Sequence, residues 1–128
     1  MLTLVGIILL ISLPRMHRLA DSLAVDRAAQ HIAAAHRRAR VAAVLRNQPL
    51  RLVIDANELS IQPSAGAALW SEPGPAADGV ALAGPARTLT FSPVGISLGV
   101  SNASFELTRG AARRTVIVSR LGRVRIVP

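Results

Sequence analysis

The first 46 residues constrain the fold more than any other part of the chain, because they carry the pattern of one long helix. Residues 1–13, MLTLVGIILLISL, form an apolar run that contains no charged residue. After Pro14, small or apolar residues recur from Met16 to Ala42, mostly at gaps of three or four, and arginines occupy the other face. The sequence therefore predicts a helix from about Leu2 to Arg46, with a kink at Pro14, where proline removes a backbone hydrogen bond.

The apolar run at the start of this helix predicts part of a membrane span. At about 1.5 Å per residue its thirteen residues cover roughly 20 Å, whereas a bilayer core needs about 30 Å. The core of a cleaved signal peptide and a buried core helix are the open alternatives. A signal peptide should begin with basic residues and end at a small-residue cleavage site, and this run has neither feature. The residues assigned to the membrane or to helix assembly are Leu2, Leu4, Val5, Ile7, Ile8, Leu9, Leu10, Ile11, Leu13 and Pro14.

The rest of the chain predicts antiparallel strands, which gives an α+β fold with a small antiparallel β-sheet domain. Period-2 alternation and turn residues predict strands at 50–54, 58–62, 88–91, 103–108, 113–119 and 123–127. Residues 63–86 are rich in Pro, Gly and Ala and predict a long surface loop, with a short strand near 80–82 and Trp70 pinning the loop to the body. The expected organisation is a membrane part (1–13), an amphipathic part (14–47) and a β-rich domain (48–128).

Composition and motifs point away from enzyme chemistry. The chain has no cysteine, so thiolate metal sites and cysteine nucleophiles are excluded. No G-x-S-x-G, HExxH or phosphate-loop pattern occurs, and the seven acidic residues are scattered. His17, His31 and His36 lie at gaps of fourteen and five, which do not suit a metal pair on a helix, and we expect them on its solvated face. We therefore expect no enzymatic activity, no cofactor, no metal and no small-molecule substrate.

Charge is distributed very unevenly along the chain. Residues 1–48 carry seven arginines and two acids, residues 49–108 two arginines and five acids, and residues 109–128 six arginines and no acid. The net charges of +5, −3 and +6 sum to the +8 of the whole chain. The last twenty residues are therefore a concentrated basic patch, consisting of Arg109, Arg113, Arg114, Arg120, Arg123 and Arg125.

Three features occur in a fixed order along the chain. A long helix begins apolar and contains Leu13-Pro14, a Phe-x-Pro-x-Gly turn occupies residues 91–95, and a C-terminal hairpin spans residues 118–125. This order resembles the GspH/FimT family of pseudopilins, which are minor subunits of type II secretion pseudopili and type IV pili. The resemblance implies a single-pass inner-membrane subunit, with its C-terminal domain in the periplasm, that assembles with other major and minor pilins or pseudopilins.

The chain departs from this family at its start. Pilin-like precursors usually carry a short basic leader, then Gly-Phe-Thr-Leu-x-Glu, and then the apolar run. Neither element is present here, and Met1-Leu2-Thr3-Leu4 resembles what usually follows the glutamate. We therefore expect the reading frame to extend upstream of Met1, by about the six residues that the bilayer thickness requires.

The basic tail suggests a second function for this class of protein. Some family members that serve DNA uptake bind DNA through a Gly-Arg-x-Arg tail, and Gly122, Arg123, Val124 and Arg125 match this motif. In a strand, Arg123 and Arg125 share one face, while Val124 and Ile126 turn inward. Such arginines would contact phosphates without reading sequence, because aromatic residues for stacking bases are nearly absent. The alternatives are a solvated edge strand and a surface that docks an acidic neighbour in the filament.

Overall fold

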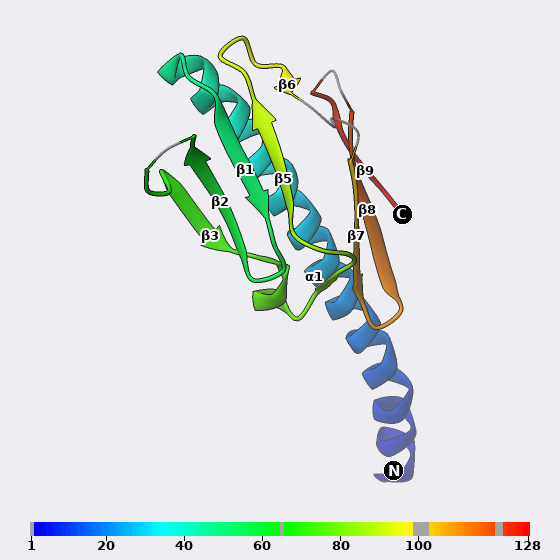
Figure 1. Cartoon of the computed structure of the whole chain (residues 1–128). Helices are drawn as coiled ribbons and strands as arrows, with labels where there is room; N and C mark the ends of the chain where they lie inside the picture. Colours follow the sequence, from blue (N-terminus) through cyan, green and yellow to red (C-terminus); the bar gives the residue numbers. More distant parts are fainter. Residues whose placement is uncertain (1, 65, 99–102, 120–121) are drawn as a thin grey trace.

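One long N-terminal helix runs the length of the molecule, and its two parts have different surroundings. In the computed structural model, which describes residues 2–64, 66–98, 103–119 and 122–128, helix α1 runs from Leu2 to Arg46. The C-terminal part of α1 packs against two antiparallel sheets, and its N-terminal part projects away from them (Figure 1). The predicted α+β class and the predicted bounds of the helix are confirmed.

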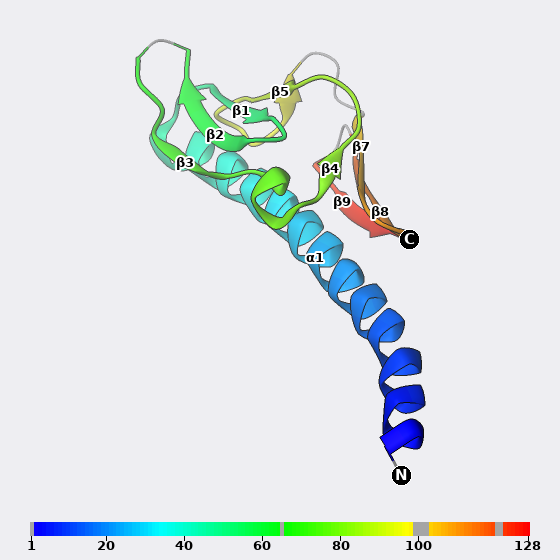
Figure 2. The ribbon, with the colours of Figure 1, turned by 90° about the horizontal axis from the view of Figure 1, so that it is seen from below.

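Local backbone chemistry explains how α1 bends and where it ends. The helix continues through Pro14 without a break, and Figure 2 shows its first turns running in a different direction from the rest. It ends where Asn47 adopts a positive φ of 50°. The Asn47 N–H donates to the Val44 carbonyl at 3.2 Å, and the Gln48 N–H donates to the Ala43 carbonyl at 3.3 Å. Together these bonds form a Schellman motif, which satisfies carbonyls of the last turn.

The face of α1 that meets the sheets is lined mainly by alanine, which lets the strands approach closely. Its buried apolar residues are Ala24, Val25, Ala28, Ala29, Ile32, Ala33, Ala35, Ala39 and Ala43. Met16, Leu19 and Leu23, which the periodicity placed on the same stripe, are 66%, 61% and 54% exposed. The packed face therefore begins at Ala24 and not directly after Pro14, because the sheets cover only the later turns of the helix.

A five-stranded antiparallel sheet covers one side of the C-terminal part of α1. Its strands are β1 (Leu50–Ile54), β2 (Glu58–Pro63), β3 (Trp70–Pro73), β5 (Arg87–Phe91) and β6 (Ser97–Leu98), in the order β3-β2-β1-β5-β6. In the central strand, Leu52 lies opposite Ile61 on one side and Leu89 on the other, and all three are buried. The alternation predicted for β1, β2 and β5 thus places their apolar residues in the core.

A separate four-stranded antiparallel sheet contains the C-terminal hairpins. Its strands are β4 (Ala81–Leu82), β7 (Ala103–Arg109), β8 (Ala112–Val118) and β9 (Val124–Val127), in the order β4-β7-β8-β9. The predicted strands 103–108, 113–119 and 123–127 correspond to β7, β8 and β9, each bound agreeing within one residue. The sequence did not predict that the strands divide into two sheets, since strand patterns do not specify partners.

The segment 63–86 is more ordered than the predicted surface loop. The short strand expected near 80–82 is present as β4, but β3 and a 3-10 helix, η1 (Pro75–Asp78), were not predicted. β3 lacks apolar alternation and is held by pairing with β2, where Trp70 lies opposite Ile61. The Trp70 ring packs against the core, and the Arg38 guanidinium carbon lies 5.0 Å from its centroid. The predicted role of Trp70, fastening this segment to the body, is confirmed.

Candidate functional site

The arginines of the basic tail separate into two groups on the folded domain. Arg109, Arg113 and Arg114 flank the β7–β8 turn, whereas Arg123 and Arg125 belong to the β8–β9 end, where Val118 pairs with Val124. These two groups lie toward opposite ends of β8. Arg120 lies outside the described residues. The single patch suggested by the sequence is therefore two surfaces with different surroundings.

The three arginines near the β7–β8 turn are each paired with an acid. Arg109 Nε lies 3.1 Å from an Asp21 carboxylate oxygen, and Arg114 Nε lies 2.8 Å from an Asp26 carboxylate oxygen. Arg113 pairs with Glu106 across the hairpin at 2.9 Å. Because two of these acids belong to α1, the pairs fasten the helix to the second sheet. The acids neutralise the charges of these three arginines, and the ion pairs give the arginines a structural role in the domain.

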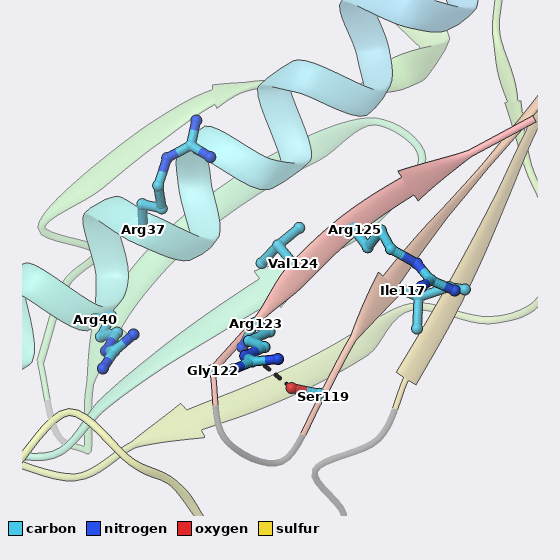
Figure 3. Close-up of a pocket in the computed structure, with 8 residues that line it drawn as sticks. All are labelled: Arg37, Arg40, Ile117, Ser119, Gly122, Arg123, Val124 and Arg125. Atoms are coloured by element: carbon cyan, nitrogen blue, oxygen red, sulfur yellow. Dashed lines mark hydrogen bonds between the residues drawn. The ribbon is translucent and has the colours of Figure 1, made fainter.

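The second group lies in a groove between α1 and the edge strand β9. The groove has a volume of about 570 Å³ and is lined by Arg37, Arg40, Ile117, Ser119, Gly122, Arg123, Val124 and Arg125. Figure 3 shows Arg37 and Arg40 extending from α1, Arg125 on β9 and Arg123 at the residue that precedes this strand. The fold thus joins the predicted Gly-Arg-x-Arg motif to two helix arginines that sequence analysis had placed on the solvated face only.

The predicted alternation along β9 is confirmed. Arg123 and Arg125 are exposed, while Val124 and Ile126 are partly buried and pack against the core. The turn that precedes them is closed by the Ser119 side chain, whose hydroxyl accepts a hydrogen bond from the Arg123 N–H at 3.1 Å. The strand therefore presents both guanidinium groups away from the core.

No acid lines this groove, and its arginines are not neutralised. Within the described part of the chain, which contains all seven acidic residues, no carboxylate lies within 4.0 Å of a guanidinium nitrogen of the four arginines. Four like charges around one opening attract anions, and a guanidinium group matches the geometry of a phosphate or carboxylate. The groove is therefore suited to an extended anionic ligand.

Arg40 lies where two glycine turns meet. Gly122 has a φ of +82°, and a Cβ at this position would lie 3.0 Å from Arg40 Nη1. Gly95, the glycine of the Phe-x-Pro-x-Gly turn, also has a φ of +82°, and its Cβ would lie 3.3 Å from Arg40 Nε. Both turns require glycine for the left-handed backbone and for the close approach of this side chain. Two motifs that are separate in the sequence thus meet at one helix arginine.

His36 is buried and does not lie on the solvated face of α1, so the prediction for this histidine is wrong. Its side chain is 1% exposed, and its ring packs edge-on against Phe91 with the centroids 4.9 Å apart. Neither ring nitrogen has a hydrogen-bond partner among the described residues. Burial, together with the positive charges of Arg40 and Arg37, lowers the pKa of His36 from 6.5 to about 4.

The other histidines lie apart from this position. His17 is exposed, and His31 is half-exposed with its Nδ1 3.7 Å from Glu72. Among the described residues, no group of three His, Asp or Glu side chains is placed to hold a metal ion.

The apolar start of α1 is the second candidate functional surface. The described large side chains of this run are 51% to 71% exposed, from Leu13 to Leu10. The helix contains an 18-residue stretch that is long and apolar enough to cross a membrane, and none of it is buried in the protein. The alternative of a buried core helix is therefore wrong.

The architecture defines the class of protein. A long helix whose later turns pack against antiparallel sheets, while its apolar start projects uncovered, is the arrangement of a pilin-like subunit. Residues 28–122 match the family described as Type II transport protein GspH, and the chain belongs to this family. The resemblance found in the sequence is thereby confirmed.

Solved structures show the same fold. The chain is similar to the type IV minor pilin FimU of Pseudomonas aeruginosa (strain PAO1) in its P21 crystal form, with a TM-score of 0.65 and 21% identity over 81% of this chain and 88% of FimU. For the P65 crystal form, the TM-score is 0.62 and the identity 20%, over 80% of this chain and 92% of FimU. No curated protein sequence gives a significant match.

Proposed function

We propose that this chain is a minor subunit of a type II secretion pseudopilus or of a type IV pilus-like filament. In this proposal the apolar start of α1 is anchored in the inner membrane, and the β-domain lies in the periplasm or in the assembled filament. The observation that carries the proposal is the uncovered apolar helix on a pilin-like domain. Uncovered apolar side chains over several helical turns are stable only in lipid or against other helices.

A charge placed in this helix tests the proposal. Leu10, which is 71% exposed, is replaced by arginine in the full chain, expressed in its own host from the native reading frame. An arginine at the centre of a membrane helix costs about 2.5–3.5 kcal/mol, so we expect the Leu10→Arg variant to leave the membrane fraction and to lose crosslinks to the other filament subunits. The control is Leu45→Arg, at a 79% exposed position near the other end of α1. Equal membrane partition and crosslinking of wild type and Leu10→Arg would contradict the proposal.

Deletion of the gene distinguishes the two kinds of filament. If the subunit belongs to a secretion pseudopilus, loss of the chain reduces protein export and leaves pili intact. If it belongs to a pilus-like filament, loss of the chain reduces piliation or DNA uptake and leaves export intact. Complementation with the full-length gene is the control for both measurements.

A second candidate function is capture of DNA by the basic tail. The specific observation in its favour is that Arg123 and Arg125 are exposed and form no ion pair with a described residue, whereas Arg109, Arg113 and Arg114 are neutralised by acids. A mobility-shift titration of the full chain in non-ionic detergent tests this function with a duplex of mixed sequence. We expect binding that weakens steeply with salt and is lost in the Arg123→Ala, Arg125→Ala double variant. Absence of binding at low salt would remove this candidate.

A further inference from the structure

We infer that Arg37 and Arg40 of α1 are phosphate-contacting residues of the same groove as Arg123 and Arg125. The inference rests on the second candidate function, and it assigns that function to a composite surface built from a helix and an edge strand. The ligand class is the sugar–phosphate backbone of a nucleic acid, contacted from two sides.

The placement of the two helix arginines is the first reason. Positions 37 and 40 are three residues apart, so their side chains leave the same side of α1 with an axial separation of about 4.5 Å. Both are exposed, and both line the groove opposite β9. A ligand strand that runs along the groove would therefore meet guanidinium groups on both walls.

The absence of competing partners is the second reason. Each described arginine between residues 48 and 119 has a partner within the domain. Arg51 donates to the Pro63 carbonyl, Arg87 lies over the Phe105 ring, and the three near the β7–β8 turn pair with acids. The groove arginines have no ion pair with any of the seven acids, all of which are described. Their charges remain available to an external anion.

The chemistry of the lining selects the kind of anion. The described residues of the lining include no acidic and no aromatic side chain. Stacking on bases requires aromatic platforms, whereas bidentate contact to phosphate requires guanidinium groups. Backbone contact without base reading is therefore the expected mode, and it should be nearly independent of sequence.

Arg40 also has a positioning role, because it lies against the glycines of both turns. Gly95 and Gly122 approach its guanidinium group from two different loops. This packing places Gly122, the first residue of the Gly-Arg-x-Arg motif, against a helix arginine of the same groove. Replacement of Arg40 therefore removes a charge and loosens a turn, and the experiment has to separate these two effects.

The experiment measures how DNA affinity depends on salt for the full chain in non-ionic detergent, using a 30-base-pair duplex. Four phosphate contacts predict a slope of about −3.6 in log affinity against log salt, or a loss of roughly 150-fold between 50 and 200 mM. The Arg37→Gln, Arg40→Gln variant keeps two contacts and should show a slope of about −1.8 and a loss of roughly 12-fold. The charge-matched control is Arg15→Gln plus Arg18→Gln, at exposed helix positions outside the groove, which should behave like the wild type.

Two further variants separate charge from folding. Arg40→Lys keeps the charge and should retain most of the slope, whereas Arg37→Gln alone removes an arginine that contacts neither glycine turn and should reduce the slope by about 0.9. The inference is overturned if Arg37→Gln and the double variant keep the wild-type slope while Arg123→Ala plus Arg125→Ala abolishes binding. If the wild type itself does not bind, the DNA-capture function fails, and the inference fails with it. That outcome would leave an acidic protein segment as the groove's ligand.

Discussion

Acidification should destabilise the β-domain through the buried histidine His36. The His36 side chain is 1% exposed, and burial, with the charges of Arg40 and Arg37, lowers its pKa to about 4 from the ordinary 6.5. Because the folded pKa lies below the unfolded one, the unfolded chain takes up the proton first as the pH falls. The contribution of neutral His36 to stability is therefore complete above pH 6.5 and is lost progressively between pH 6.5 and 4.

The size of this effect follows from the two pKa values. At 1.36 kcal/mol per pKa unit, the difference between 6.5 and about 4 corresponds to roughly 3 kcal/mol, which is reached below pH 4. At pH 5 the unfolded state is almost fully protonated and the folded state is mostly neutral, so the expected loss is about 2 kcal/mol. Such a loss is a large fraction of the stability of a small domain.

Urea unfolding at pH 7.5 and pH 5 measures the loss directly. The chain has one tryptophan, Trp70, which packs against the core and reports unfolding by its fluorescence. The His36→Leu variant removes the titrating ring, and we expect its free energy of unfolding to change about 2 kcal/mol less between the two pH values than that of the wild type. His31→Gln is the matched control, because it replaces a half-exposed histidine of the same helix and leaves His36 in place. An equal loss of stability in the wild type and in His36→Leu would refute the reasoning.

Three further predictions concern the packing of the domain. Gly122→Ala places a side chain at a φ of +82° and 3.0 Å from a helix guanidinium nitrogen, so urea unfolding should show a loss of at least about 1 kcal/mol. Asp26→Ala removes the 2.8 Å pair with Arg114 that ties α1 to β8 and should cost about 0.5–1 kcal/mol, with faster hydrogen exchange in β8. Ala39→Leu overfills a position that is 0% exposed and should cost about 1–3 kcal/mol in thermal unfolding, whereas the same change at the exposed Ala34 should be nearly neutral. Unchanged stability in any of the three variants would contradict the contact in question.

Local patterns in the sequence were sufficient for the elements themselves. The periodicity of small residues predicted α1 with its observed bounds, since an amphipathic helix depends on neighbours three and four positions away. Strands β1, β2, β5, β7, β8 and β9 followed from alternation between turn residues. The strand β3 could not be predicted, because Trp70–Pro73 has no apolar alternation and is held by its pairing with β2.

Helix periodicity predicted which residues could be buried, but not which of them the sheets cover. Met16, Leu19 and Leu23 have the same spacing as the buried residues, yet the sheets do not reach them. His36 lies next to arginines in the sequence, yet its side chain is buried and packs against Phe91 of β5. In both cases the deciding neighbour is distant along the chain.

The sequence by itself determined that this chain is a long, apolar-ended helix followed by a β-rich domain, and it located Gly122, Arg123 and Arg125 as a basic motif. Only the tertiary structure decided which arginines lie together and which are paired with acids. In the folded domain, Arg109, Arg113 and Arg114 form ion pairs with acids. Arg37 and Arg40 line the same groove as the Gly-Arg-x-Arg motif. The physical reason is that periodicity reports which side of an element faces the core, whereas charge pairing depends on which elements pack side by side. The helix that begins as an apolar projection thus ends as one wall of the basic groove.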